Sequence, residues 1–352
     1  MPTLSNFVTL GFCLGTSLLL GCASGSPILA GCPNPSLPCA NPKVSVIAMS
    51  DKDGTLQAAG NAAASKFRDI FGKPVPPTII VPGGTITPET AAKLKDNGFK
   101  TLLPWLSAAD RARLRNASIL KQIEDQTKNL PESLRTSARQ QALAQLKSSA
   151  DSKPKSEQLA ALSHELSHMW FIAAFKENGE TTKGHAYGGW APDWLDETAA
   201  VLLENFELKE KRRTHFFKLG ANDQFPLTEF LTMEHPAAKT AKTLKNANSN
   251  ETTQENKNSN AGASLRVLTG EEAQAFIKAS GGERTVNFYS QVLVFSDYLI
   301  ERGGGIFIFS DLASSLADGM SFKEWLANNS SGLPNTISGL EEDWKFWLSS
   351  TR

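Results

Sequence analysis

Apolar positions recur along this chain with two different periods, which predict a mixture of strands and helices. Short apolar runs predict strands at 44–49, 78–81 and 101–106. Apolar residues three and four positions apart predict helices at 56–71, at 108–150 with a break near Pro131, and at 155–175. We therefore expect an α+β fold, with a small mixed lobe over 43–150 and a mainly helical remainder.

Capping residues indicate where several helices begin and end. Thr87 before Pro88 predicts the N-cap and the first residue of a helix, and Gly98 lies just past its end. Near the C-terminus, Ser-x-x-Glu spacings that begin at Ser321 and Ser338 predict two more helix starts. The last of these helices carries two tryptophans, which we expect to pack in the core.

The predicted helix at 155–175 carries two histidines. His164 and His168 are four residues apart, so both imidazoles lie on one face of the helix and can reach one ion. Large and small apolar residues point to the other face: Leu159, Leu162, Leu166, Met169 and Ala173. Glu165 is close enough to touch a water on such an ion. This His-Glu-x-x-His pattern is typical of zinc hydrolases, whereas two histidines packed in a core would leave the Glu between them unexplained.

A carboxylate on the next helix is the candidate third metal ligand. Pro192 suits the start of that helix, and Glu197 lies on a surface of mostly small residues. A zinc site with these three ligands keeps its fourth position for water. The alternative is a glutamate that only stabilises the helix start, a role for which Asp193, Asp196 and Glu204 are better placed. Asp196 and Asp193 are also the next candidates for the third ligand.

The N-terminus resembles that of a bacterial lipoprotein. Residues 7–20 form an apolar run that is too short to span a membrane as a mature helix and ends in Leu-Leu-Gly-Cys, which resembles a lipobox. We expect a signal peptide over 1–21, a lipidated Cys22 and a Pro-rich linker over 22–42. The residues before Phe7 include no Lys or Arg, which leaves open an uncleaved anchor or a misassigned start.

All four cysteines lie within the first forty residues. Cys13 would be lost with the signal peptide. Cys32 and Cys39 flank a Pro-rich loop and would form either a disulfide in an oxidising envelope or two free thiols. Because no cysteine lies near the histidines, a zinc ion there would have only nitrogen and oxygen ligands.

Net charge and local composition give further indications of the function and of the domain organisation. Lys+Arg and Asp+Glu both number 36, so the net charge is zero, and no basic patch indicates nucleic-acid binding. Residues 237–264 are rich in Asn, Lys, Thr and Ser, with Leu244 as the one large apolar residue, which predicts a flexible insertion. The rest of 43–352 is expected to be one catalytic domain with a zinc-site and helical part over 151–352.

Two segments resemble the gluzincins, the zinc metallopeptidases whose third ligand is a Glu, and most closely their peptidase MA-like family. They read His-Glu-Leu-Ser-His at 164–168 and Pro-Asp-Trp-Leu-Asp-Glu-Thr-Ala-Ala at 192–200. A helix led by Tyr289, a Gly-rich turn, a short helix and a Trp-bearing end extend the resemblance to about 159–348, without the insertion. Thr198 replaces a Gly and Val292 replaces a Ser that are frequent in that family.

The resemblance implies a zincin-like domain with one Zn²⁺ per chain, held by His164, His168 and Glu197. A catalytic zinc lowers the pKa of its bound water to about 7, and Glu165 would accept the proton and pass it to the leaving amine. Gluzincins commonly use a Tyr or His from the C-terminal part to stabilise the oxyanion. Tyr289 is our candidate.

Other residues compete for the role of oxyanion donor. Tyr187 and His185 are rivals because their Gly-flanked loop precedes the helix of the third ligand. Tyr298 lies among apolar residues and is predicted to be a core residue.

The resemblance also implies hydrolysis of peptides or proteins in the cell envelope. Ala23 after the cysteine resembles lipoproteins sorted to the outer membrane, so the expected location is its periplasmic side, with a lipid anchor. Two alternatives remain: a zinc-binding envelope lipoprotein that acts as a scaffold or sensor without turnover, and hydrolysis of a bond other than a peptide bond.

Overall fold

The computed structural model describes residues 32–148, 154–175, 190–237 and 282–351, and every structural statement below concerns these ranges. The predicted signal peptide, the lipidation site Cys22 and all but the first residue of the predicted insertion at 237–264 lie outside them. Cys32 and Cys39 are disulfide-bonded, which decides between the two alternatives for this pair. None of the helices within the described ranges is both long enough and apolar enough to cross a membrane.

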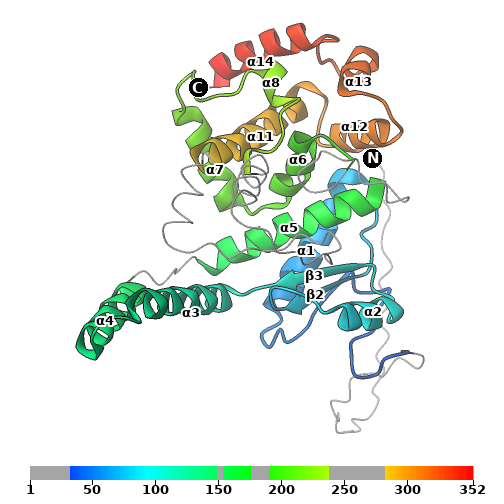
Figure 1. Cartoon of the computed structure of the whole chain (residues 1–352). Helices are drawn as coiled ribbons and strands as arrows, with labels where there is room; N and C mark the ends of the chain where they lie inside the picture. The colour runs from blue at the N-terminus through cyan, green and yellow to red at the C-terminus, as the bar shows by residue number, and fades with distance from the viewer. Residues whose placement is uncertain (1–31, 149–153, 176–189, 238–281, 352) are drawn as a thin grey trace, which may run out of the picture. The chain divides into compact units, whose positions relative to one another are not determined.

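A parallel sheet forms the lobe that precedes the histidine-bearing helix. Its strands lie in the order β1 (Val46–Ala48), β2 (Thr78–Pro82) and β3 (Thr101–Trp105). Parallel neighbours need a crossover between them, and α1 (Thr55–Phe71) and α2 (Pro88–Asp96) provide these two connections (Figure 1). The three predicted strands are confirmed, with ends that differ from the prediction by two residues or fewer.

Helices make up most of the remaining described chain. They are α3 (Ala108–Thr127), α4 (Glu132–Ser148), α5 (Lys155–Phe175), α6 (Asp193–Leu203), α7 (Phe206–Lys218), α8 (Leu227–Phe230), α11 (Gly282–Arg302), α12 (Ile308–Ala317), α13 (Phe322–Asn328) and α14 (Ile337–Thr351). The fold is therefore mixed and mostly helical, with one small parallel sheet. The predicted break near Pro131 separates α3 from α4.

Two of the predicted helix starts are confirmed and one is wrong. The side chain of Thr87 caps α2, and Ser321 forms a capping box with Glu324 at α13. Ser338, in contrast, is the second residue of α14. The hydroxyl of Thr336 instead accepts a hydrogen bond from the N–H of Gly339 at 3.1 Å, so Thr336 takes the capping position that the Ser-x-x-Glu spacing assigned to Ser338.

The prediction that Tyr289 opens a helix is also wrong. In the described chain, α11 extends back to Gly282, which places Tyr289 about two turns inside the helix. The polar residues before Phe288 made the helix start look later than it is. The tryptophans of α14, Trp344 and Trp347, are buried as predicted, each with 4 % of its surface exposed.

Helix α5 lies in the interior of the fold. It packs against α1, α6 and β3, and α6 in turn packs against α11. Trp170 of α5 is fully buried and donates a hydrogen bond from Nε1 to Oγ1 of Thr78 in β2 at 2.8 Å. Both histidines are buried. On the face predicted to be core, Leu162 and Leu166 are buried, whereas Leu159 and Met169 are half-buried and Ala173 is exposed. Helix α6 packs against α5 and covers the histidines.

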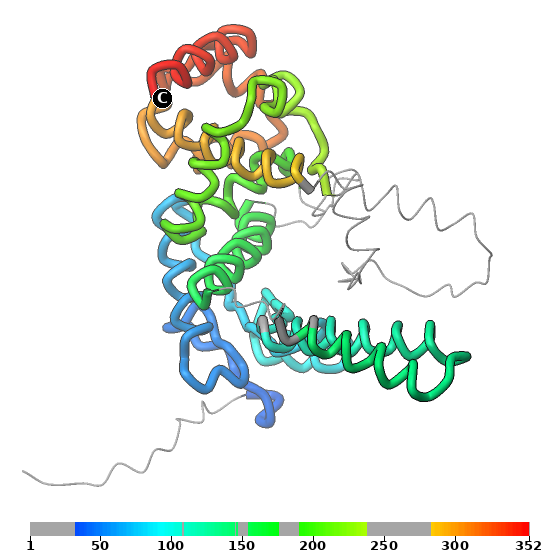
Figure 2. The backbone as a smooth tube through the Cα atoms, turned by 90° about the vertical axis from the view of Figure 1, so that its left-hand side faces the viewer, coloured from blue at the N-terminus to red at the C-terminus, as the bar shows by residue number. Residues whose placement is uncertain are grey.

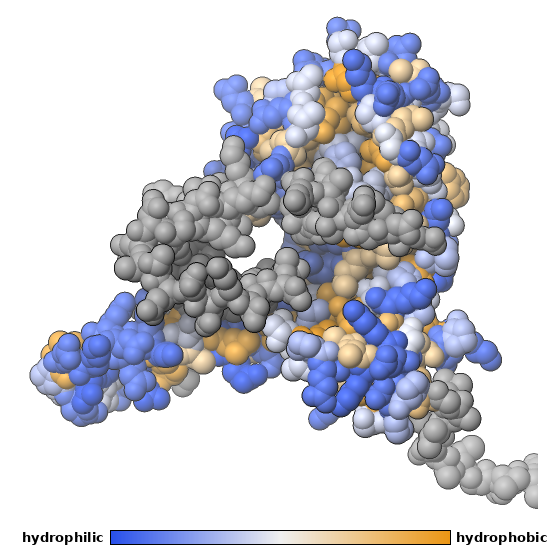
Figure 3. Space-filling model, turned by 45° about the vertical axis from the view of Figure 1, so that its right-hand side comes forward, coloured by the Kyte–Doolittle hydropathy of each residue, from blue (hydrophilic) through white to orange (hydrophobic). Residues whose placement is uncertain are grey.

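Helices α3 and α4 run side by side as an antiparallel pair (Figure 2). Several of their large apolar side chains stay exposed, namely Leu114, Leu134 and Leu143, together with Leu130 in the connection. Hydrophobic residues are accordingly visible among the hydrophilic surface of this pair (Figure 3). Most of the buried core lies elsewhere, in α1, α5, α6 and the C-terminal helices.

Candidate metal centre

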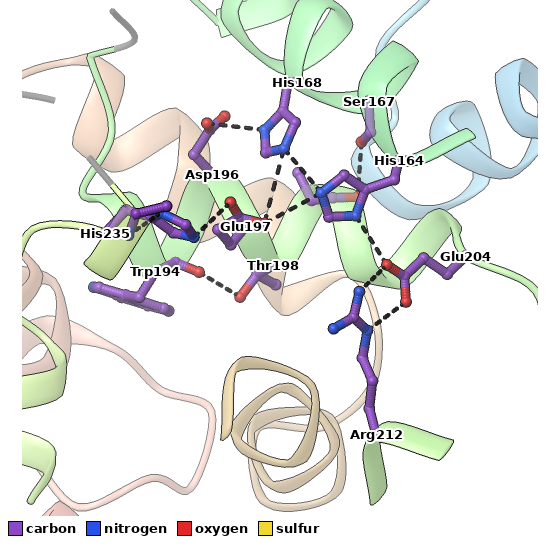
Figure 4. A network of polar contacts seen from close by, with 12 residues as sticks. His164, Ser167, His168, Trp194, Asp196, Glu197, Thr198, Glu204, Arg212 and His235 are labelled. Atoms are coloured by element: carbon purple, nitrogen blue, oxygen red, sulfur yellow. Dashed lines mark hydrogen bonds and ion pairs between the residues drawn. The ribbon is translucent and has the colours of Figure 1, made fainter. Parts of the chain in front are cut away.

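Two imidazoles of α5 and one carboxylate of α6 converge on a common point. His164 and His168 are 7 % and 5 % exposed, and their Nε2 atoms lie 3.2 Å apart. Glu197 is fully buried, and its Oε2 lies 3.4 Å from Nε2 of His164 and 3.8 Å from Nε2 of His168. Figure 4 shows the three side chains pointing toward one another. The structure therefore brings together the three residues that the sequence predicts as ligands.

The spacing of these atoms suits a small divalent cation. Nitrogen and oxygen ligands about 2.0–2.1 Å from a tetrahedral zinc lie about 3.3 Å from one another. The three measured separations, 3.2, 3.4 and 3.8 Å, are close to that value. A metal ion needs several His, Cys, Asp or Glu side chains with their ligand atoms close together. Within the described ranges, His164, His168 and Glu197 form such a group.

Two further carboxylates fix the orientation of the imidazoles. Oε1 of Glu204 lies 2.9 Å from Nδ1 of His164, and Oδ2 of Asp196 lies 2.9 Å from Nδ1 of His168. A carboxylate can only accept a hydrogen bond, so each neutral ring carries its proton on Nδ1. The lone pair of Nε2 then faces the common point. The guanidinium of Arg212 donates to both oxygens of Glu204.

The sequence did not reveal these two roles. Asp196 and Glu204 were interpreted as carboxylates that stabilise a helix start, but Glu204 is the residue after the C-terminal end of α6. Asp196 reaches the outer nitrogen of His168 instead of the common point. Asp193, the other alternative ligand, accepts a hydrogen bond from the backbone N–H of His235 at 2.6 Å.

The electrostatics of the cluster favour a bound positive charge. Burial lowers the pKa of His168, but the carboxylates of Asp196 and Glu197 outweigh burial and raise this pKa to about 10. Burial also raises the pKa of Glu204, yet hydrogen bonds from Arg212 and His164 overcome that effect and lower it. The carboxylates beside His168 thus favour a positive charge at that imidazole, whether from a proton or from a bound metal ion.

The two side chains assigned to catalysis occupy different environments. Glu165 is exposed, although the histidine before it is buried. Tyr289 is half-buried on α11, with its ring centroid 5.7 Å from that of His164. The guanidinium of Arg212 lies 4.7 Å from the centroid of the Tyr289 ring. Tyr289 therefore borders the cluster, as its candidate role requires.

The other tyrosines and the unusual residue Thr198 are also accounted for where the structure describes them. Tyr298 is buried in the core and donates to Asp343 at 2.9 Å, as predicted for a core residue. Tyr187 and His185 lie outside the described residues. Thr198 donates to the carbonyl of Trp194 at 2.8 Å and lies 3.3 Å from the hydroxyl of Ser296, so its side chain belongs to the packing between α6 and α11.

His235 is a site residue that the sequence analysis missed. It follows α8, it is 1 % exposed, and its Nε2 lies 3.5 Å from Oε1 of Glu197. Burial and the nearby histidines lower its pKa to about 4. No motif marks this histidine, because the fold brings it to Glu197 across 38 positions of sequence.

Comparison with protein-family models, with curated proteins and with solved structures gave no match for this chain. The resemblance to gluzincins therefore depends on the two segments at 164–168 and 192–200, whose residues the structure brings together.

Proposed function

We propose that this protein is a zinc-dependent peptide hydrolase of the gluzincin type, with one Zn²⁺ per chain held by His164, His168 and Glu197. The observation that carries the proposal is the convergence of two imidazole Nε2 atoms and one carboxylate oxygen at 3.2–3.8 Å. The outer carboxylates on both Nδ1 atoms add to it, since metal-binding histidines usually donate to such a partner.

The charge balance of the cluster supports a divalent ion. Asp196, Glu197 and Glu204 are at most 3 % exposed and bring three negative charges into the interior. Arg212 offsets one of them through its contacts with Glu204. Buried charges are costly unless they are paired or coordinate a metal, and a charge of +2 would balance the remaining two.

The residues around this centre have different proposed roles in peptide hydrolysis. When bound, Zn²⁺ supplies Lewis acidity, which polarises a carbonyl and makes water more acidic. Glu165 lies beside His164 and is exposed, so it accepts the proton of the attacking water and returns it to the leaving amine. The hydroxyl of Tyr289 donates a hydrogen bond to the oxyanion that develops on the scissile carbonyl.

The decisive experiment combines metal analysis with a peptide-cleavage assay. We expect about one Zn²⁺ per wild-type chain and strong loss of metal in His164→Ala, His168→Ala and Glu197→Ala. Glu165→Gln should keep its zinc and lose turnover, because it removes the proton acceptor and no ligand. Glu157→Gln, on the first turn of the same helix, is the matched control and should retain both.

Two outcomes of this experiment would contradict parts of the proposal. Wild-type zinc content in Glu197→Ala would show that the third ligand lies elsewhere. Stoichiometric zinc in the wild type with no turnover of a broad peptide library would favour the alternative, a zinc-binding envelope lipoprotein without catalysis.

The proposed location is the cell envelope, with a lipid anchor on Cys22. It is supported by the Leu-Leu-Gly-Cys sequence at 19–22 and by the disulfide between Cys32 and Cys39, since disulfides persist in oxidising compartments. Cys22→Ser should abolish incorporation of labelled fatty acid and release the protein from the membrane fraction. An unprocessed variant that still sediments with membranes would show that the apolar run is an uncleaved anchor.

A further inference from the structure

His235 lies against the carboxylate of Glu197, on the side away from the two histidine ligands. Its Nε2 is 3.5 Å from Oε1 of Glu197. The other oxygen, Oε2, is the one that faces His164 and His168. The two oxygens of one buried carboxylate therefore have different neighbours, as Figure 4 shows.

The backbone around His235 determines where the ring carries its proton. The N–H of Ala237 donates to Nδ1 of His235 at 3.2 Å. A nitrogen that accepts a hydrogen bond is unprotonated, so the neutral ring carries its hydrogen on Nε2. The atom of Glu197 nearest to this protonated nitrogen is Oε1, at 3.5 Å.

Packing holds the imidazole in this orientation. The backbone N–H of His235 donates to Oδ2 of Asp193 at 2.6 Å, which connects His235 to the first turn of α6. The rings of Phe288 and Tyr289 lie against it, with centroids 5.1 and 5.2 Å away. A side chain that is 1 % exposed and held in this way has little freedom to turn Nδ1 toward the cluster.

We propose that His235 is a positioning residue that engages Oε1 of Glu197 and so leaves Oε2 alone to bind the metal. This inference rests on the metal site proposed above. A carboxylate can bind a metal through one oxygen or both, and a hydrogen-bond donor at Oε1 opposes the second bond. Ligation through Nε2 would move this hydrogen to Nδ1 and break the hydrogen bond from Ala237, so three protein ligands remain and a fourth position is left for water.

Co²⁺ is a suitable probe, because four-coordinate Co²⁺ absorbs visible light more strongly than Co²⁺ with more ligands. Two variants distinguish the effect of the N–H donor from the effect of the volume of the ring. His235→Gln retains an N–H donor, whereas His235→Phe fills the space without one. We expect His235→Gln to keep the wild-type visible spectrum. His235→Phe should weaken Co²⁺ binding about 10–100-fold, as is typical for outer partners of metal ligands, and lower the intensity of the visible bands.

Phe288→Leu is the matched control for disturbed packing, since Phe288 contacts the His235 ring and offers no donor. It should lower the melting temperature without changing Co²⁺ affinity or the spectrum. If His235→Phe does not fold, His235→Leu takes its place and is compared with His235→Gln in the same way.

Wild-type affinity and spectrum in the variant without a donor would overturn the proposed role of His235. A wild-type protein that binds no Co²⁺ would overturn this role together with the metal site. If Co²⁺ binds and the variants behave as expected, but no peptide is cleaved, the hydrolase proposal fails and the role of His235 stands.

Discussion

Arg212 connects two residues of the candidate site that have different proposed roles. Its guanidinium donates to Glu204, which contacts Nδ1 of His164, a proposed metal ligand. The same guanidinium lies 4.7 Å from the centroid of the Tyr289 ring. Burial would lower the pKa of Arg212, but Glu204 outweighs that effect and raises it, so the residue stays charged. One buried cation thus helps to orient a ligand and holds the ring of the proposed oxyanion donor.

Replacing Tyr289 by Phe tests the oxyanion role directly. Loss of one oxyanion donor typically lowers kcat about 10²–10³-fold, and we expect this loss while zinc content and melting temperature stay close to wild type. The ring and its contact with Arg212 are kept in this variant. Steady-state kinetics of a cleaved peptide, metal analysis and thermal unfolding measure the three quantities.

Tyr298→Phe is the matched control for Tyr289→Phe. It removes a hydroxyl that donates to the partly buried carboxylate of Asp343, so it should affect stability and leave kcat unchanged. An unchanged kcat in Tyr289→Phe, with the loss appearing in Tyr187→Phe or His185→Ala, would assign the donor to the loop before α6.

At the level of elements, the contact between α1 and β1 depends on a glycine. Gly60 lies in the middle of α1, and a Cβ added there would lie 2.6 Å from Cγ1 of Val46. Replacing a helical Gly by Ala ordinarily stabilises a helix by about 1 kcal/mol. Here we expect Gly60→Ala to lower the free energy of unfolding by about 1–3 kcal/mol, because Val46 is fully buried and stiff.

Denaturant titration of a double-mutant cycle measures this effect. In a Val46→Ala background the obstructing methyl groups are gone, so Gly60→Ala should become neutral or stabilising. Equal effects of Gly60→Ala in both backgrounds would show that the close approach of α1 to β1 does not limit the helix.

The elements that the sequence predicts correctly are those specified by local signals. The strands of the sheet and the Thr87 cap follow from apolar runs and capping chemistry within a few residues. The positions of Asp196, Glu204 and His235 around the ligands depend instead on how α5, α6 and the segment after α8 pack together. The burial of the histidines has the same origin, since nothing local to α5 shows that α6 packs against it.

At the level of the whole molecule, the proposed metal ligands come from two helices that are joined through residues outside the described ranges. His164 and His168 belong to α5, and Glu197 belongs to α6, which also packs against α11. An ion bound by all three would link the helix that lies on the sheet to the C-terminal helices. Its removal would leave the buried carboxylates of Asp196 and Glu197 less well compensated.

We therefore expect a chelator to lower the melting temperature of the wild-type protein by several degrees. A ligand at 100 times its dissociation constant stabilises the folded state by about 2.7 kcal/mol, and the melting temperature should rise again as Zn²⁺ is titrated into the metal-free protein. Glu197→Ala should melt at the same temperature with and without chelator, because it lacks one of the three ligands. A wild-type protein that carries zinc yet melts identically after chelation would show that the ion does not connect α5 to α6, and a chelator response that persists in Glu197→Ala would place the stabilising ion at another site.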